Sequence, residues 1–418
     1  MKTRVLLLWV AVAAAAGALS LAQVRRCPRV PFDAAANARR VAAISEAQLL
    51  TLPPNLLVDA ARQRQAACVA GYGRARAILG MAALLAAPLA WIALGWHRSS
   101  ARLWPNSPPS VRFAGIGALL AVWIWAWGLP FDVADVLAAR GLGLSRETAA
   151  TFLSNQGAGL GLQVLAAAIV AQTLGVLRRP RWSLWYTLGL APLTVFVAII
   201  VPLWIAPLFN TYRPMPPSPL RDAIEQEASR AGLREARIFE TNLSAQREAA
   251  NAFVFGLWKT QRIVVGDTLV QRYGKDEVLF VLAHEMGHAV HGDVYRGVAW
   301  AWLFGGITLV LTEMLEPRRQ RELPPESRVP ALLAIALGLG VLTQPLGNAI
   351  SRSIEHRADL YALQLNGNRP AGVRTFVRFA DENLAQLCPP RWAVTMFASH
   401  PPLGDRISLM QGRPDVCR

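Results

Sequence analysis

Charged side chains are scarce in this sequence. Asp, Glu, Lys and Arg make up 17% of the 418 residues, whereas soluble domains carry about 25%. Hydrophobic residues reach 53%. This composition excludes a chain built only of soluble domains, although its length would suit roughly two or three of them.

Acidic residues are the scarcer of the two charge types. Lys and Arg number 43 against 27 for Asp and Glu, which gives a net charge of +16. Almost all of the basic residues are Arg, and they lie in short connectors between apolar runs. Nucleic-acid binding requires a clustered basic surface on a folded module, so we expect no nucleic-acid partner. The pattern favours contact with anionic lipid headgroups.

Cysteine is also sparse, and its spacing is not that of a metal motif. The four residues, Cys27, Cys68, Cys388 and Cys417, contain no CxxC pair. A zinc ribbon built on cysteines is therefore excluded. The chain also has no internal repeat and no low-complexity linker.

Long apolar runs dominate what is present. A membrane helix needs about 20 mostly apolar residues, and seven stretches meet or approach this length, the sixth being the shortest. The sequence thus predicts a mainly α-helical protein with a seven-helix transmembrane bundle. The stretches are Val5–Ala22, Ala77–Trp96, Phe113–Val133, Gly157–Leu177, Leu184–Ile205, Gly297–Leu311 and Val329–Ile350.

The boundaries of these runs divide the chain into six parts. Residues 1–22 are either the first span or a secretory signal peptide, because basic residues precede an apolar run that ends in small residues. Residues 23–76 are an Arg-rich amphipathic loop, with helical patterning at Ala42–Leu50 and Val58–Cys68. The other parts are spans two to five (77–205), a segment of soluble composition (206–296), spans six and seven (297–350) and a polar tail (351–418).

The pattern of the soluble segment predicts a helix, a strand, a β-hairpin and a second helix. Ser218 is the expected N-cap of the first helix, and Asp276 and Glu277 suit the first turn of the second. Two β-rich runs joined by a short turn indicate the hairpin. In order, the elements cover Ser218–Ala231, Ala236–Glu240, the paired runs Asn251–Gly256 and Arg262–Gly266, and the stretch from Asp276 toward His291.

A metal-binding motif, His284-Glu285-Met286-Gly287-His288, lies on the second helix. Two His four residues apart share one face of a helix, so both imidazoles can reach one ion. Zinc accepts neutral imidazole nitrogen, and the intervening Glu285 is placed to act as general base on a metal-bound water. The alternative is a polar helix face with two surface His.

A catalytic zinc site usually has three protein ligands. His291 is only three residues past His288 and would reach the same ion poorly, and Val294 replaces the His that a metzincin needs. Glu355 is the better candidate, because two spans separate it from His288 and return the chain to the same membrane face. Asp359 shares the helix face of Glu355 and can accept a hydrogen bond from the far nitrogen of a ligating His, unless it is merely solvated.

With these residues and several other segments, the sequence resembles the type I CAAX prenyl endopeptidases, seven-span zinc proteases of the gluzincin class. The resemblance covers most of the chain from about residue 113 and is strongest after residue 206. Besides the His284–His288 motif and Glu355, it rests on Ala206-Pro207-Leu208-Phe209-Asn210, Asn251-Ala252-Phe253 with Phe255-Gly256, Arg262-Ile263-Val264-Val265 with Asp267-Thr268-Leu269, Ser351-Arg352, Ala358-Asp359, and Ser399-His400-Pro401-Pro402-Leu403 with Arg406.

The resemblance implies a bundle that encloses a chamber and is capped by a gluzincin-like α+β zinc protease domain with a small β-hairpin. It implies an edge strand that holds the substrate backbone, with Phe253 where the family has Tyr. His400 could instead cap a helix or fill a core, and Arg406 could form a structural ion pair. The implied site residues are His284, His288 and Glu355 for one Zn²⁺ per chain, Glu285 for catalysis, His400 and Arg406 along the active site, and Asn251, Ala252 and Phe253 for substrate.

These features predict a zinc metalloendopeptidase that cleaves peptide or protein substrates, with or without a lipid modification. Two other functions stay open: a membrane quality-control protease with broad substrates, and a non-hydrolytic chamber protein for lipid-linked or apolar ligands. The intact Glu285 argues against the second. We expect a monomer surrounded by membrane lipids, and the Arg- and Ala-rich composition is typical of a bacterial inner-membrane protein.

Two arguments conflict on which side of the membrane the site faces. The resemblance implies a cytoplasmic catalytic face. All four cysteines, however, fall on the face of His284 in two local pairs, Cys27–Cys68 and Cys388–Cys417, which suits an oxidising periplasm. Basic residues do not decide, since twelve lie in the segments of the opposite face and eleven on the catalytic face. We therefore expect a periplasmic catalytic face with both disulfides.

Overall fold

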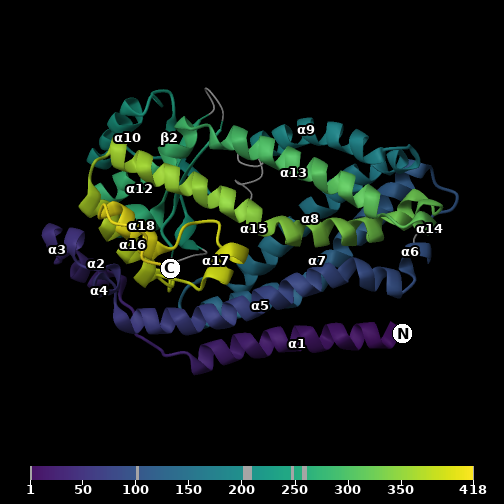
Figure 1. Ribbon diagram of the computed structural model, residues 1–418, viewed down its shortest axis with the longest axis horizontal. Coiled ribbons are helices and arrows are strands. Elements are labelled where there is room, and N and C mark those ends of the chain that lie inside the picture. Colours follow the sequence, from purple (N-terminus) through teal and green to yellow (C-terminus); the bar gives the residue numbers. More distant parts are fainter. Residues whose placement is uncertain (1, 100–102, 201–209, 246–248, 257–260, 418) are drawn as a thin grey trace.

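The computed structural model describes residues 2–99, 103–200, 210–245, 249–256 and 261–417 (Figure 1). Long helices run across the molecule, and the strands gather with several shorter helices at one end. The N-terminus, α6 (Trp96–Ser99) and α14 (Arg318–Arg321) lie at the other end. The chain therefore divides into a helical bundle and an α/β part.

Seven long helices of the described chain form the bundle, which confirms the mainly α-helical, multi-pass fold. Six of them are long and apolar enough to cross a membrane. The apolar part of α9, Trp182–Ala198, is shorter, and the remainder of the fifth predicted span, 201–205, lies outside the described residues, as do residues 206–209 of the motif that follows it. The helices are α1 (Lys2–Arg26), α5 (Ala60–Ala93), α7 (Pro109–Gly141), α8 (Ala149–Ala171, continued by the 3₁₀ helix η2, Gln172–Arg178), α9 (Trp182–Ile200), α13 (Asp293–Leu315) and α15 (Pro325–Leu365).

Helix α1 packs against the bundle along its length. Ala16 is fully buried in a cluster with Ala83 and Ala87 of α5, where small side chains let the helix backbones approach. The Trp9 indole N–H donates to the carbonyl of Trp127 in α7 at 3.2 Å. Residues 2–26 thus pack as a bundle helix, and the choice between a retained span and a cleaved signal peptide stays a prediction.

The segment expected as a loop, 23–76, is mostly helical. Helix α5 begins at Ala60, with Asp59 as its N-cap, so the helix that contains the second predicted span starts well before Ala77. The helix predicted over Ala42–Leu50 is wrong, because Ser45 and Gln48 form a capping box that starts a new helix. The short helices of this segment are α2 (Ala34–Ala42), α3 (Glu46–Thr51) and α4 (Pro54–Leu57).

These short helices build the back of the α/β part. Val41, Leu49 and Leu57 are at most 1% exposed, and they share one hydrophobic core with Phe280 of the motif helix. Burying a side chain of this size contributes about 1.5–3 kcal/mol. The N-terminal segment, in which the sequence pattern matched the family only weakly, is therefore needed to support the helix that carries His284.

A four-stranded sheet covers the other side of that helix. Its order is β1-β2-β4-β3, so β3 lies at an edge. β3 and β4 are antiparallel, which confirms the predicted hairpin pairing, whereas β2 and β4 are parallel. The sequence did not predict β1. The strands are β1 (Tyr212–Pro214), β2 (Arg237–Thr241), β3 (Ala252–Phe255) and β4 (Arg262–Gly266).

The motif helix α12 (Lys275–Val290) lies at the centre of the α/β part. Leu282 and Met286 share a core with Ile263 of β4, and Phe280 packs edge-on against Phe376 of α16. Packing on both sides fixes the orientation of α12. The remaining helices are α10 (Pro219–Arg230, capped by Ser218 as predicted), η5 (Leu243–Ala245), α11 (Asp267–Arg272), α16 (Arg369–Glu382), α17 (Arg391–Phe397) and α18 (Leu403–Met410).

Candidate metal centre

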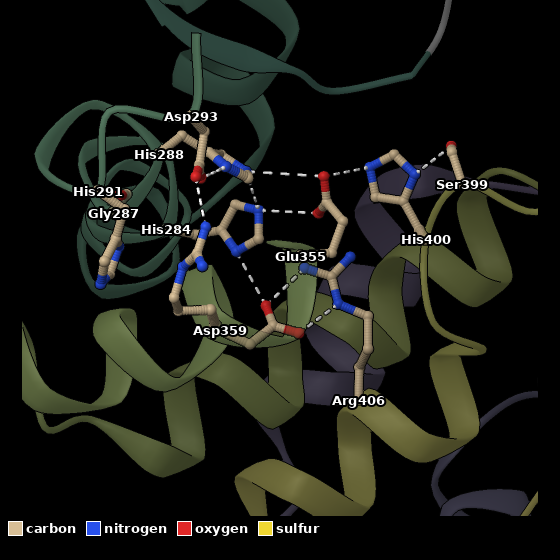
Figure 2. A network of polar contacts seen from close by, with 11 residues as sticks. His284, Gly287, His288, His291, Asp293, Glu355, Asp359, Ser399, His400 and Arg406 are labelled. Carbon is tan, nitrogen blue, oxygen red and sulfur yellow. Dashed lines mark hydrogen bonds and ion pairs between the residues drawn. The ribbon is translucent and has the colours of Figure 1, made fainter. Parts of the chain in front are cut away.

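Helix α12 turns both His side chains of the motif toward α15 (Figure 2). The two helices approach closely at Gly287, where an added Cβ would lie 3.2 Å from Tyr361 Cβ and 3.3 Å from Ala358 Cα. A larger residue at this position would push the helices apart. Gly287 therefore allows Glu355 of α15 to reach the two imidazoles.

Three potential ligand atoms converge at this point. His284 Nε2 lies 3.2 Å from His288 Nε2 and 3.2 Å from Glu355 Oε2, and His288 Nε2 lies 3.6 Å from Glu355 Oε1. Ligands at zinc bond lengths of about 2.0–2.1 Å in a tetrahedron stand roughly 3.3 Å apart. The spacing therefore fits one zinc ion, and these three residues form a candidate metal-binding group in the described chain.

The second nitrogen of each imidazole faces a carboxylate. His284 Nδ1 lies 2.9 Å from Asp359 Oδ1, and His288 Nδ1 lies 2.9 Å from Asp293 Oδ2. A carboxylate accepts a hydrogen bond, so each of these two carboxylates keeps the imidazole proton on Nδ1. The Nε2 lone pair is then free to bind a metal ion. Two bare lone pairs and an anionic carboxylate then face one another, an arrangement that a cation stabilises.

Arg406 of α18 supports this site through Asp359. Its guanidinium donates to both carboxylate oxygens, from Nε at 2.8 Å and from Nη2 at 2.6 Å, and Asp359 is fully buried. The sequence left two roles open for Arg406, an active-site lining and a structural ion pair. The structure shows the ion pair, which holds the carboxylate next to His284 Nδ1, and the lining of the active site by Arg406 stays a prediction.

Asp293 and its partner were missed in the sequence. Asp293 begins α13 just after Gly292, which has a left-handed φ of 65°, and Arg357 of α15 donates to its other oxygen. No helical spacing connects Asp293 to His288 across this break. The one available signal was an Asp in the first turn of the next span.

We expect Asp293→Ala to weaken zinc binding about 10–100-fold, the usual cost of losing a carboxylate behind a ligating His. Competition with a chelating metal indicator measures the affinity. Asp222→Ala, which removes an exposed carboxylate on α10, is the matched control. Equal affinities in the two variants would show that Asp293 does not orient His288.

Glu285 follows His284 on α12. Burial raises the pKa of its carboxyl above the ordinary value, while the nearby imidazoles of His284 and His288 act in the opposite direction. Among the described residues, no hydrogen bond or ion pair occupies its carboxylate. The group is thus free to accept a proton, as the motif predicts for a general base.

His400 lies on the far side of Glu355 from the other two imidazoles (Figure 2). Its Nε2 is 3.3 Å from Glu355 Oε1, its Nδ1 is 2.9 Å from Ser399 Oγ, and its side chain is 58% exposed. An exposed imidazole beside the ligand group is available to a substrate. This position fits an active-site His better than a core His.

His291 points away from the metal-binding group. Its Nδ1 lies 2.7 Å from the carbonyl of Gly287, and its ring packs edge-on against Tyr361. It caps the end of α12, so the structure agrees with its exclusion as a ligand.

The residues expected to bind substrate lie at and before the edge strand β3. Ala252 is buried and Asn251 is exposed; the carbonyl of Asn251 accepts from Gly266 N at 2.9 Å. Phe253 contacts the rings of Tyr212 and Phe255. Among the described strands β3 pairs only with β4, so within that part of the chain the other edge of β3 is open to strand addition.

The structure joins the four cysteines in the two expected pairs. Cα–Cα separations are 5.7 Å for Cys27–Cys68 and 5.0 Å for Cys388–Cys417. Both fall within the range that a disulfide bridges without backbone movement. Both predicted pairs are therefore confirmed, and the orientation of the chain in the membrane stays a prediction.

Comparison with known proteins agrees with this fold. The model of peptidase family M48 matches residues 216–413, and that of the CAAX prenyl protease N-terminal region, described as five membrane helices, matches residues 50–211. The crystal structure of S. mikatae Ste24p is similar in fold, with a TM-score of 0.73 over 96% of this chain and 98% of that one, at 21% identity.

Relatives in sequence include bacterial and plant proteins. A protein named uncharacterized metalloprotease YhfN, from Bacillus subtilis (strain 168), is 33% identical over 54% of this chain and 55% of its own length. A CAAX prenyl protease 1 homolog from Oryza sativa subsp. japonica is 29% identical over 76% of this chain and 80% of its own length. The match thus spans about half of the first relative and most of the second.

A multi-pass helical bundle that carries an HExxH helix beside a glutamate from the last span defines a membrane metalloprotease. The chain belongs to peptidase family M48 and carries the N-terminal membrane region of the CAAX prenyl proteases. Metalloproteases of this family are zinc-dependent and act on peptide bonds.

Proposed function

We propose that the chain is a zinc endopeptidase that hydrolyses peptide bonds with one Zn²⁺ held by His284, His288 and Glu355. The observation that carries this proposal is the convergence of two imidazole lone pairs and one carboxylate at distances of 3.2–3.6 Å. When bound there, zinc lowers the pKa of a water molecule and polarises the scissile carbonyl.

The side chains around this group divide the remaining work. Glu285 takes the proton of the attacking water and gives it to the leaving amine. His400 donates a hydrogen bond to the oxyanion that develops on the carbonyl. The free edge of β3 holds the substrate backbone by strand addition, with Asn251, Ala252 and Phe253 in contact with substrate.

The substrates we propose are peptide segments of membrane-associated proteins. A site at the end of a transmembrane bundle meets chains that are anchored or inserted nearby, including lipid-modified ones. A quality-control protease with the same chemistry remains the second candidate, because its broad substrates would need no further recognition site. The chamber inside the bundle, which the family resemblance implies, is part of the same proposal. A non-hydrolytic chamber protein is not favoured, since it would have no use for Glu285.

We propose a bacterial inner-membrane location with the catalytic face in the periplasm. Cys27 follows the end of α1 and Cys68 lies near the start of α5, beside the α/β part, while Cys388 and Cys417 lie against α18 within it. Disulfides persist in oxidising compartments. Thiol labelling of intact cells and of opened vesicles tests this orientation. Cysteines that label without prior reduction in freshly lysed cells would instead place this face in the cytoplasm.

Cleavage profiling of the purified protein tests the proposed activity. Mixtures of soluble peptides, transmembrane peptides and prenylated peptides are digested in detergent, and the products are identified by mass spectrometry. We expect cleavage to depend on zinc and to favour membrane-associated peptides. Absence of any zinc-dependent product from the intact chain would refute the proposed hydrolysis.

We expect His400→Ala to reduce kcat by about 10²-fold, the scale of one lost oxyanion donor, while the zinc content stays near that of the parent. His356→Ala is the matched control, because His356 is exposed on α15 next to Glu355 in the sequence. Unchanged kcat with a lowered melting temperature would assign His400 a structural role.

A further inference from the structure

One disulfide closes a loop that contains two residues of the site. The Cys388–Cys417 bond spans 29 positions of sequence. Within this loop lie α17, His400 and α18 with Arg406. The three zinc ligands lie outside it. The bond can therefore affect the geometry of His400 and Arg406 without cutting any connection between the ligands.

Helix α18 is seated directly on this bond. An added Cβ at Gly404 would lie 2.7 Å from Cys417 Sγ and 2.9 Å from Cys388 Sγ, and Gly404 N donates to the carbonyl of Leu387 at 3.0 Å. Asp405 Oδ1 accepts from the backbone N–H of Cys417 at 2.8 Å. The first turn of α18, which precedes Arg406, is thus held against the sulfur atoms.

The C-terminal end of α17 is held by side chains of α15. Asn348 Nδ2 donates to the carbonyls of Thr395 and Met396, at 3.2 and 2.8 Å. Arg352 Nη1 donates to those of Val394 and Ala398, at 3.0 and 2.8 Å. The carbonyls of Thr395 and Met396 are among those that the C-terminus of a helix leaves without intrahelical partners, whereas the carbonyl of Val394 also accepts from Ala398 N.

Asn348, Arg352 and the proposed zinc ligand Glu355 all lie on α15. Asn348 and Arg352 precede Glu355 by about two turns and one turn of α15, so α15 sets the position of α17 and of the ligand together. Ser399 and His400 follow the last anchored carbonyl directly. Any loosening of this contact changes the distance between His400 and Glu355.

We propose that the Cys388–Cys417 bond, with Asn348 and Arg352, forms a positioning device that holds His400 against the metal centre. The inference rests on the proposed function, because positioning is read out as turnover. Misplacing a catalytic group by about 1 Å can cost 10²-fold in rate. Opening the bond lowers kcat and leaves zinc bound.

The bond is also accessible to reductant. Cys388 is exposed, whereas Cys27 of the other disulfide is 4% exposed, and a cavity of about 400 Å³ reaches Cys417 and Arg352. A water-soluble phosphine attacks one sulfur and breaks the S–S bond. One water molecule then supplies the oxygen of the phosphine oxide and the two protons of the two thiols. Mild phosphine treatment therefore opens this bond first and lowers the rate.

The test compares two paired variants of the full chain. Cys388→Ser with Cys417→Ser should lower kcat about tenfold or more, with KM changed less and zinc content unchanged. Cys27→Ser with Cys68→Ser removes a disulfide that encloses no site residue and should retain kcat. Adding His400→Ala to the first pair should cause little further loss, because both changes act through the same side chain.

Other outcomes overturn the inference. Unchanged kcat in the first pair, equal losses in both pairs, or a full additional loss on adding His400→Ala would each refute it. If the first pair does not fold, Asn348→Ala and mild reduction of the folded parent replace it, with the same expected loss of kcat. A parent that cleaves no peptide would refute the proposed function instead, so the two failures are distinct.

Discussion

Glu285→Gln should lose hydrolysis by at least about 10²-fold while it keeps zinc and the fold. The amide has the size of the carboxyl but cannot accept the proton of the attacking water, and general bases contribute about 10²–10⁴-fold. The three ligand atoms lie on other side chains, so metal binding should not change. Steady-state kinetics with the best peptide from the cleavage profile measures the loss.

Two controls make this result specific to Glu285. Metal analysis of the purified variant should give the parent zinc content, and its melting temperature should match that of the parent. Glu225→Gln, an exposed glutamate on α10, controls for loss of a carboxylate elsewhere. Near-normal turnover in Glu285→Gln would contradict the proposed mechanism, because Glu285 is the one carboxylate proposed to take the proton of the attacking water.

Removal of any one of the three ligands should abolish both zinc and activity. Each of His284→Ala, His288→Ala and Glu355→Ala leaves two protein ligands where catalytic zinc sites use three. Losing one partner also leaves the remaining buried polar atoms unsatisfied. Metal analysis after size-exclusion chromatography checks the prediction, and zinc should be near zero in all three variants.

His291→Ala is the matched control for these variants. It removes a third His of the same helix, one that contacts the Gly287 carbonyl rather than the ligand group. Zinc content and turnover should stay at the parent level. Full zinc occupancy in Glu355→Ala would instead remove Glu355 from the metal site.

Much of this fold follows from patterns that are local in sequence. Apolar length alone indicates the bundle helices, and alternation of residue types indicates the β3–β4 pairing. The sixth span, which is the shortest in the sequence, runs to Leu315 as α13. Each of these elements carries its own signal, because burial in a membrane or a sheet sets the residue pattern along the whole element.

The elements that were missed depend on contacts with distant parts of the chain. Helices α2 to α4 are short and pack into the core that surrounds Phe280. Their apolar residues form no periodic run long enough to predict where each helix begins and ends. Strand β1 has three residues and, within the described part of the chain, pairs only with β2. Strands this short are too brief for a repeating pattern to emerge.

The same distinction holds at the site. His284, His288 and Glu355 follow from helical spacing and from counting membrane crossings. The contacts of Asp293 with His288 and of Arg406 with Asp359 join separate elements, and only the folded chain brings them together. The proposed metal ligands and the carboxylate of Asp359 behind His284 were therefore predictable from the sequence, whereas the contact of Asp293 with His288 and that of Arg406 with Asp359 were not.

Zinc removal and restoration tests the central claim most directly. The purified chain is stripped with a chelator, and hydrolysis of one peptide is followed while zinc is added back in measured amounts. The account predicts that activity disappears with the metal, returns in proportion to added zinc and levels off at one ion per chain. Hydrolysis that persists in metal-free protein would contradict the claim that His284, His288 and Glu355 form a catalytic zinc site.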